Sequence, residues 1–176
     1  MSEAFHGEVI VRSLEELLQE NLGAALDEVA AFWLEIEPVA LTDVPAEGYY
    51  IGHKPSLISR PSSDFPMIAL IAPGRSPNGA RSRTFQSERY RVYIDIFNVA
   101  DDEETVNMMT WRYIEAVTKV VQSVATIEGY SIGDYKPEVN ISEAGRHMKD
   151  QDAADMSFQE DEDFAPIGRV TIVLTD

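Results

Sequence analysis

The residues whose types could perform chemistry are few, and their spacing does not suit the reactions they suggest. Gly129–Gly133 reads G-x-S-x-G, the pattern of a hydrolase nucleophile turn, which requires a strand before the serine and a helix after it. Here a helical pattern precedes the motif and a strand pattern follows it, so we interpret Ser131 as a chance match. The histidines, His6, His53 and His147, lie in unrelated segments without a metal-ligand spacing.

Acidic residues concentrate at two places where a divalent cation is the first ligand to consider. Asp150–Asp155 lacks the alternating ligands, the glycine and the terminal glutamate of an EF-hand, which leaves only loose divalent binding open. At Asp101–Glu104 a helical pattern follows, so we expect Asp101 to accept the free N–H groups of the first turn and Glu104 to complete a capping box. The sequence also contains neither glycine-rich phosphate-binding pattern. We therefore expect no enzymatic activity, no metal and no cofactor.

The clearest structural element is a strand from Tyr90 to Val99. Every second residue from Tyr90 to Ile96 is apolar, which predicts one sheet face packed on a core. The other face mixes polar and apolar side chains, with Val99 at its end and before it Arg91, Tyr93, Asp95 and Phe97. Because this second face is not fully polar, we expect it to be covered by the chain itself or by a neighbour. Arg91, Tyr93, Asp95 and Phe97 are therefore candidates for a subunit interface.

Two helices are predicted from apolar residues that recur at spacings of three and four. Ser13 and Glu16 form a capping-box pattern, which places the start of the first helix there and its end near Trp33. The second helix follows the acidic turn, and its apolar stripe is Val106, Met109, Tyr113, Val117, Val120 and Val124. We expect this stripe to pack on the apolar face of the strand that precedes it.

The remaining strands are predicted near residues 49–51, 65–72, 139–141 and 170–174. The resulting order is α-β-β-β-α-β-β, an α/β (α+β) pattern without internal repeats. At 176 residues the chain is long enough for one domain, residues 1–176, with a substantial core.

The charge is distributed unevenly along the chain. The net charge is −17, which argues against simple binding to nucleic-acid phosphate. From residue 48 to residue 87, however, the chain contains five basic residues and only one acidic residue. We expect a basic arm at residues 73–88, with Arg75, Arg81 and Arg83 binding a partner, and an acidic loop at residues 145–164. Unlike patches steer and register partners, so this distribution suits self-association or docking, although a solvated loop with chance arginines is the alternative.

The composition also bounds the class of protein. The longest apolar run, Met67 to Ala72, is too short to cross a bilayer, so we expect no membrane partner. No secretory pattern follows Met1, and the sequence has no cysteine. We expect synthesis in the cytoplasm.

Taken together, these segments resemble the tail terminator family of long-tailed bacteriophages. The similar features are the helix beginning Ser13-Leu14-Glu15-Glu16, the apolar strand from Phe65, the long loop after it, the strand from Tyr90, the acidic turn with its long helix, and a final strand from Val170. The resemblance implies a curved, mostly antiparallel or mixed sheet flanked by two main helices. It also implies a homo-oligomeric ring, commonly a hexamer, that caps the tail tube in the virion, stops its polymerisation and offers a surface to the head.

The partners implied by the resemblance are the tail tube protein, the head-completion or connector protein and, in a contractile tail, the sheath protein, with DNA only passing through the ring. Two alternatives stay open. One is a head-completion or connector adaptor of the neck, and the other is an acidic inhibitor that imitates nucleic-acid phosphate. The three arginines of the arm argue against the inhibitor, and a substrate-sized pocket with perturbed acids near Ser131 would revive a hydrolase.

Overall fold

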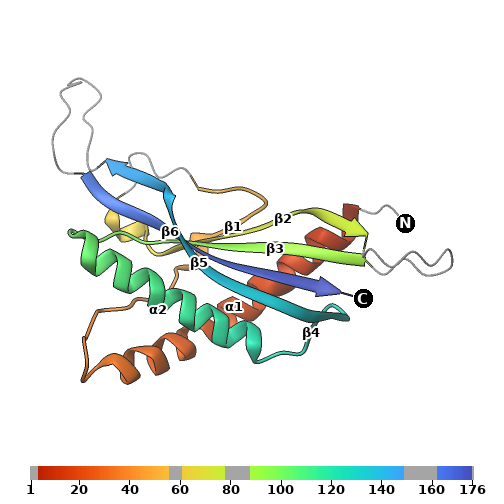
Figure 1. Ribbon diagram of the computed structural model, residues 1–176, viewed down its shortest axis with the longest axis horizontal. Helices are drawn as coiled ribbons and strands as arrows, with labels where there is room; N and C mark the ends of the chain where they lie inside the picture. The colour runs from red at the N-terminus through yellow and green to blue at the C-terminus, as the bar shows by residue number, and fades with distance from the viewer. Residues whose placement is uncertain (1–3, 56–60, 78–87, 149–161, 176) are drawn as a thin grey trace.

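Two long helices cover one face of a six-stranded mixed sheet (Figure 1). The computed structural model describes residues 4–55, 61–77, 88–148 and 162–175. Its elements in chain order are α1 (Ala4–Trp33), β1 (Tyr49–Ile51), β2 (Met67–Pro77), β3 (Glu88–Phe97), α2 (Glu103–Gln122), β4 (Thr126–Ile127), β5 (Tyr130–Met148) and β6 (Glu162–Thr175), with short 3₁₀ helices at Ala46–Gly48 and Ser62–Asp64.

The strands lie in the order β1-β2-β3-β6-β5-β4. β1 is parallel to β2, and the other neighbouring strands are antiparallel. The expected class, an α+β fold with a curved mixed sheet flanked by helices, is confirmed. The expected element order is wrong in one place, because a two-residue strand, β4, lies between α2 and β5. So short a strand leaves no periodic signal in a sequence.

The first helix begins about ten residues earlier than its capping-box pattern predicts. α1 starts at Ala4, and Ile10 and Val11 are buried in continuation of the stripe formed by Leu14 and the residues after it. The Ser13 hydroxyl therefore does not cap the helix but donates a hydrogen bond to the carboxylate of Glu128. Burial of the added apolar residues outweighs the local preference of serine for a helix start.

The second helix is capped one residue later than expected. The N-cap is Asp102, not Asp101, and its Oδ1 accepts a hydrogen bond of 2.8 Å from the Thr105 backbone N–H. Hydrogen bonds from Thr105 lower the pKa of the Asp102 carboxyl below its ordinary value. The predicted apolar stripe is confirmed for the five positions within α2: Val106, Tyr113, Val117 and Val120 are buried, and Met109 packs against them. Val124 packs against the same core but lies beyond the helix, which ends at Gln122.

The boundaries predicted for the basic arm and the acidic loop are both wrong. β2 passes through an irregularity between Ile71 and Gly74 and continues to Pro77, where it pairs with Glu88. A bulge of this kind admits a Pro-Gly pair that would otherwise end a strand. Likewise, residues 145–148 belong to β5 and residues 162–164 to β6. The parts of the two segments at residues 78–87 and 149–161 lie outside the described residues.

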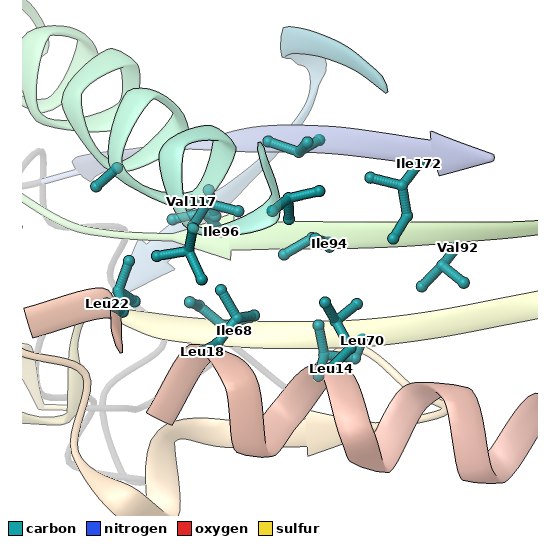
Figure 2. Close-up of a cluster of buried hydrophobic side chains, with 14 of the residues drawn as sticks. Leu14, Leu18, Leu22, Ile68, Leu70, Val92, Ile94, Ile96, Val117 and Ile172 are labelled. Atoms are coloured by element: carbon teal, nitrogen blue, oxygen red, sulfur yellow. The ribbon is translucent and has the colours of Figure 1, made fainter. Parts of the chain in front are cut away.

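The main core lies between the helices and the inner face of the sheet. Figure 2 shows Leu14, Leu18 and Leu22 of α1 facing Ile68 and Leu70 of β2. Beside this contact, on the same face of the sheet, Val117 of α2 lies next to Ile96 of β3, and Ile94 of β3 and Ile172 of β6 extend the layer. All of these side chains are at most 2% exposed. The packing predicted between the second helix and the alternating strand is therefore confirmed.

Candidate protein-interaction site

The outer face of the sheet is partly covered by the chain itself. A second apolar cluster lies there, away from the helices, and consists of Phe65, Met67, Ala69, Phe97 and Ile167, with Tyr50, Ile71 and Val99 at its margin. Phe97 is 1% exposed and Asp95 is fully buried. Of the four predicted interface candidates, these two are covered by their own chain and cannot contact a neighbour in this state. Tyr93 is half-buried and Arg91 is exposed.

Asp95 is the centre of an ion-pair network next to this cluster. Arg169 on β6 donates from Nε to Oδ1 at 2.6 Å and from Nη2 to Oδ2 at 2.8 Å. Lys54 places its Nζ 3.6 Å from Oδ2, and the guanidinium of Arg169 lies 4.6 Å from the ring centroid of Tyr93. The two cations compensate the charge of a carboxylate that has no access to water. This network is a structural one, and sequence spacing alone could not reveal that Lys54 and Arg169 join Asp95.

The outer face stays partly open towards the start of β3 and the end of β6. Arg91 is exposed there, and Tyr93, Thr171 and Val173 are half-buried. Because the apolar cluster ends before these residues, this half of the outer face offers a mixed polar and apolar surface. A neighbouring molecule could cover it without disturbing the core.

A groove of about 710 Å³ crosses the solvent-facing side of α2, between the end of α1 and β5. Trp33 and Glu37 form one side and Pro137 the other, while α2 contributes the floor. The α2 side chains that line the groove are Met108, Trp111, Arg112, Ile114, Glu115, Thr118, Lys119 and Gln122. Sequence reasoning missed this groove, although Trp111 lies off the predicted apolar stripe and is 53% exposed.

Arg112 is the unusual residue of the groove, since it is a cation that is only 5% exposed. Its Nη2 donates to the backbone carbonyl of Glu37, and its guanidinium lies 5.1 Å from the ring centroid of Trp33. Its Nη1 is buried without a hydrogen-bond partner in the described part of the chain, and so is Oγ1 of Thr118. Buried polar atoms are normally hydrogen-bonded, so these two atoms are available to an incoming polar group.

The segment between α1 and β1 is held by α2. The Tyr113 hydroxyl accepts a hydrogen bond of 3.0 Å from the Thr42 backbone N–H and donates one of 2.8 Å to the Thr42 carbonyl. Burial raises the pKa of the Tyr113 phenol. Burial, followed by the charges of Asp43 and Glu15, raises the pKa of Tyr49 to about 12. These contacts fix the side of the groove that carries Glu37.

The predicted arm residues fall in different places. Arg75 lies in β2 opposite Tyr90, so its backbone belongs to the sheet and not to an arm. Arg81 and Arg83 lie outside the described residues, as does most of the acidic loop.

The residues that suggested chemistry in the sequence lie on separate elements of the structure. The described residues include no group of three or more histidine, aspartate or glutamate residues that could hold a metal ion. Ser131 lies at the start of β5 opposite Thr126, and His53 is exposed with its Nδ1 3.1 Å from the Ile51 carbonyl oxygen. Within the same residues, neither helix has the length and apolar character needed to span a membrane.

Comparisons with known proteins give no assignment: no protein-family model matches the chain, and no curated protein matches it significantly.

Proposed function

We propose that this protein is a structural subunit of a homo-oligomeric ring, a hexamer, that terminates the tail of a long-tailed bacteriophage. The α+β fold and the order of its helices and main strands agree with what the resemblance to tail terminators implies. In this role the ring caps the tail tube, stops its polymerisation and provides the surface on which the head docks. The protein would then reside in the virion.

The observation that carries the proposal is a concentration of exposed large apolar side chains around the end of α1. Phe32, Leu34 and Ile36 are 64%, 65% and 64% exposed, and Trp111 of the adjacent groove is 53% exposed. The Phe32 and Trp33 rings pack edge to face with their centroids 5.3 Å apart, which connects this group to the groove. Single exposed apolar residues are normal, but a group of them on one side of the molecule indicates a surface that a partner covers.

The geometry also favours contact with more than one partner. The groove lies on the helical side of the molecule, whereas the open half of the outer sheet face lies on the opposite side. A ring subunit contacts its two neighbours through different surfaces, because head-to-tail contacts that close by rotation are heterologous. The tail tube protein, the head-completion protein and, in a contractile tail, the sheath protein are the further partners. Arg75, Arg81 and Arg83 remain candidate contacts to them.

The proposal is tested by light scattering and negative-stain electron microscopy of the purified protein, alone and with its tail tube protein. We expect closed rings, and we expect added protein to stop the growth of tubes. A Leu34→Ser/Ile36→Ser variant should assemble less well while its thermal unfolding stays close to that of the parent, because exposed substitutions shift stability by roughly 0.5 kcal/mol or less. Ala40→Ser, an exposed change in the same segment, is the matched control.

A protein that stays monomeric at high concentration, and that forms no ring in assembled virions, would remove the proposal. Equal assembly by the parent and the Leu34→Ser/Ile36→Ser variant would show instead that the exposed apolar group is not the contact surface.

A further inference from the structure

The groove on α2 combines apolar side chains with two buried polar atoms that a bound partner could contact. Its walls are largely apolar, with Trp33, Trp111 and Pro137 among them. Within it, Arg112 Nη1 and Thr118 Oγ1 are buried without a hydrogen-bond partner among residues 4–55, 61–77, 88–148 and 162–175. A groove with such a composition suits a ligand that combines a large apolar side chain with an oxygen acceptor.

The preferred acceptor is a carboxylate. Arg112 is a permanent cation that is 5% exposed, and no carboxylate of the described chain lies within ion-pair distance of it. Three other charged residues line the groove. Glu115 accepts a hydrogen bond of 3.4 Å from Trp33 Nε1, Lys119 pairs with Glu28 at 3.4 Å, and Glu37 contacts Arg112 through its backbone carbonyl. An incoming carboxylate would bind Arg112 with charge-assisted hydrogen bonds in a place that water hardly reaches.

This chain itself contains a segment with that combination. Residues 150–161 read DQDAADMSFQED, with acids before and after Met156 and Phe158. The described strands that flank the segment end at Met148 and begin again at Glu162. In Figure 1 these strand ends lie on the far side of the sheet from α2, which favours delivery to the groove of another molecule.

We propose that the acidic segment 150–161 of one copy binds in the α2 groove of the neighbouring copy. One of its carboxylates pairs with Nη1 of Arg112, and the side chain of Phe158 or Met156 packs against Trp111. This inference rests on the proposed ring, and it names the contact by which one subunit holds the next.

Strand addition at the sheet edges is the competing way to join copies, and the sequence opposes it. β5 pairs with β4 only at residues 130–131, so most of its outer edge has no strand partner in the described chain. Pro137 lies in that edge strand, and Pro73 and Pro77 lie in the part of β2 that extends beyond β1. Proline has no N–H to donate to a new strand, so prolines in edge strands disfavour edge-to-edge pairing.

The test measures self-association of the full chain by sedimentation velocity over a range of concentrations. Trp111→Ala, and separately Asp152→Asn/Asp155→Asn/Phe158→Ser, should each weaken the association constant at least about tenfold, since buried tryptophan contacts dominate interfaces of this kind. The variant that combines both sets of changes should associate no more weakly than the weaker of the two separate variants, because both sets remove the same contact. Val9→Ala, an exposed apolar change on α1 that lies outside both the groove lining and the group of Phe32, Leu34 and Ile36, is the matched control for folding and for general loss of apolar surface.

A second measurement isolates the contact. A fluorescently labelled peptide of residues 150–161 is titrated against dilute full-length protein and followed by anisotropy. We expect binding that weakens with salt, and that weakens at least about fivefold in both Trp111→Ala and Arg112→Lys, because lysine keeps the charge but lacks the second guanidinium nitrogen.

The outcomes separate this inference from the ring proposal. Rings that persist unchanged in the groove and segment variants overturn the inference and leave the ring. A monomeric protein whose groove still binds the peptide overturns the ring and supports the match between groove and segment. A monomeric protein that does not bind the peptide overturns both.

Discussion

Replacing Asp95 by asparagine should destabilise the subunit strongly, although it changes only one atom. Asp95 is fully buried and lies opposite Ala69 of β2 and Arg169 of β6. Its two oxygens accept two hydrogen bonds from Arg169, and Oδ2 also forms an ion pair with Lys54. Asparagine has nearly the same shape, so the substitution leaves no cavity. It removes the negative charge and turns one acceptor towards Arg169 into a donor.

The expected size of the effect follows from the exposure of the partners. Removing one member of a fully buried ion pair costs about 3 to 5 kcal/mol. The Arg169 and Lys54 side chains are 15% and 37% exposed, so water can take over part of their solvation. We therefore expect a loss of about 2 to 4 kcal/mol in the free energy of unfolding. For a chain of this size that corresponds to a fall in Tm of roughly 5 to 15 °C.

Urea and thermal unfolding, followed by circular dichroism, measure this loss. Glu8→Gln is the control, because Glu8 pairs with Arg12 on the surface of α1 with both side chains more than half exposed. It should cost roughly 0.5 kcal/mol or less. The double variant Asp95→Leu/Arg169→Met should be less destabilised than Asp95→Asn, since a well-packed apolar pair can replace a buried ion pair. If Asp95→Asn unfolds within a degree or so of the parent, the network is not what holds this part of the sheet together.

Three further changes test the packing of the helices and their connection. Val120→Ala, in the core, should lower the free energy of unfolding by about 1 to 3 kcal/mol, whereas Gln122→Ala on the exposed side should have little effect in the same urea titration. Tyr113→Phe removes both hydrogen bonds to Thr42 and should cost about 1 to 2 kcal/mol, with faster hydrogen exchange of the Thr42 amide; unchanged exchange would contradict this role. Because the pKa of Tyr49 is raised to about 12 in the folded state, its contribution to stability should be complete below pH 10 and lost as the pH rises towards 12. Tyr49→Phe should flatten that alkaline loss, and an unaltered pH profile would refute the assignment.

The sequence predicted the fold where a single periodicity extended over a whole element. The alternation from Tyr90 to Ile96 and the stripe of α2 are such cases, and both faces are buried as expected. Local signals failed where tertiary packing opposed them. The capping box at Ser13 was overridden because Ile10 and Val11 continue the buried stripe of α1, and the break expected at Pro73 was absorbed by an irregularity in β2.

The candidate site was less predictable, because its parts come from separate elements. Trp33, Arg112 and Pro137 meet only when α1, α2 and β5 are packed, and no spacing in the sequence relates them. Arg112 is covered by the connection after α1, whose Glu37 carbonyl accepts its hydrogen bond, and no local pattern around Arg112 indicates this. Only Trp111, an apolar residue outside the helical stripe, could have pointed to this surface. The sequence predicted that the outer sheet face is covered. It did not predict which half the chain itself covers, because that depends on the position of the loop that carries Phe65.

The position of β6 in the sheet has a consequence for how the protein is made. Although β6 follows all the other described strands in the sequence, it lies in the middle of the sheet, between β3 and β5. During synthesis β3 therefore waits with an unpaired edge until β6 has left the ribosome, and the pairing of Ile94 with Val170 then closes a loop of more than seventy residues. Non-local pairing of this kind is slow, and exposed strand edges are prone to aggregate in the meantime. We expect expression at low temperature or with chaperones to raise the soluble yield, and truncation within β6 to abolish it.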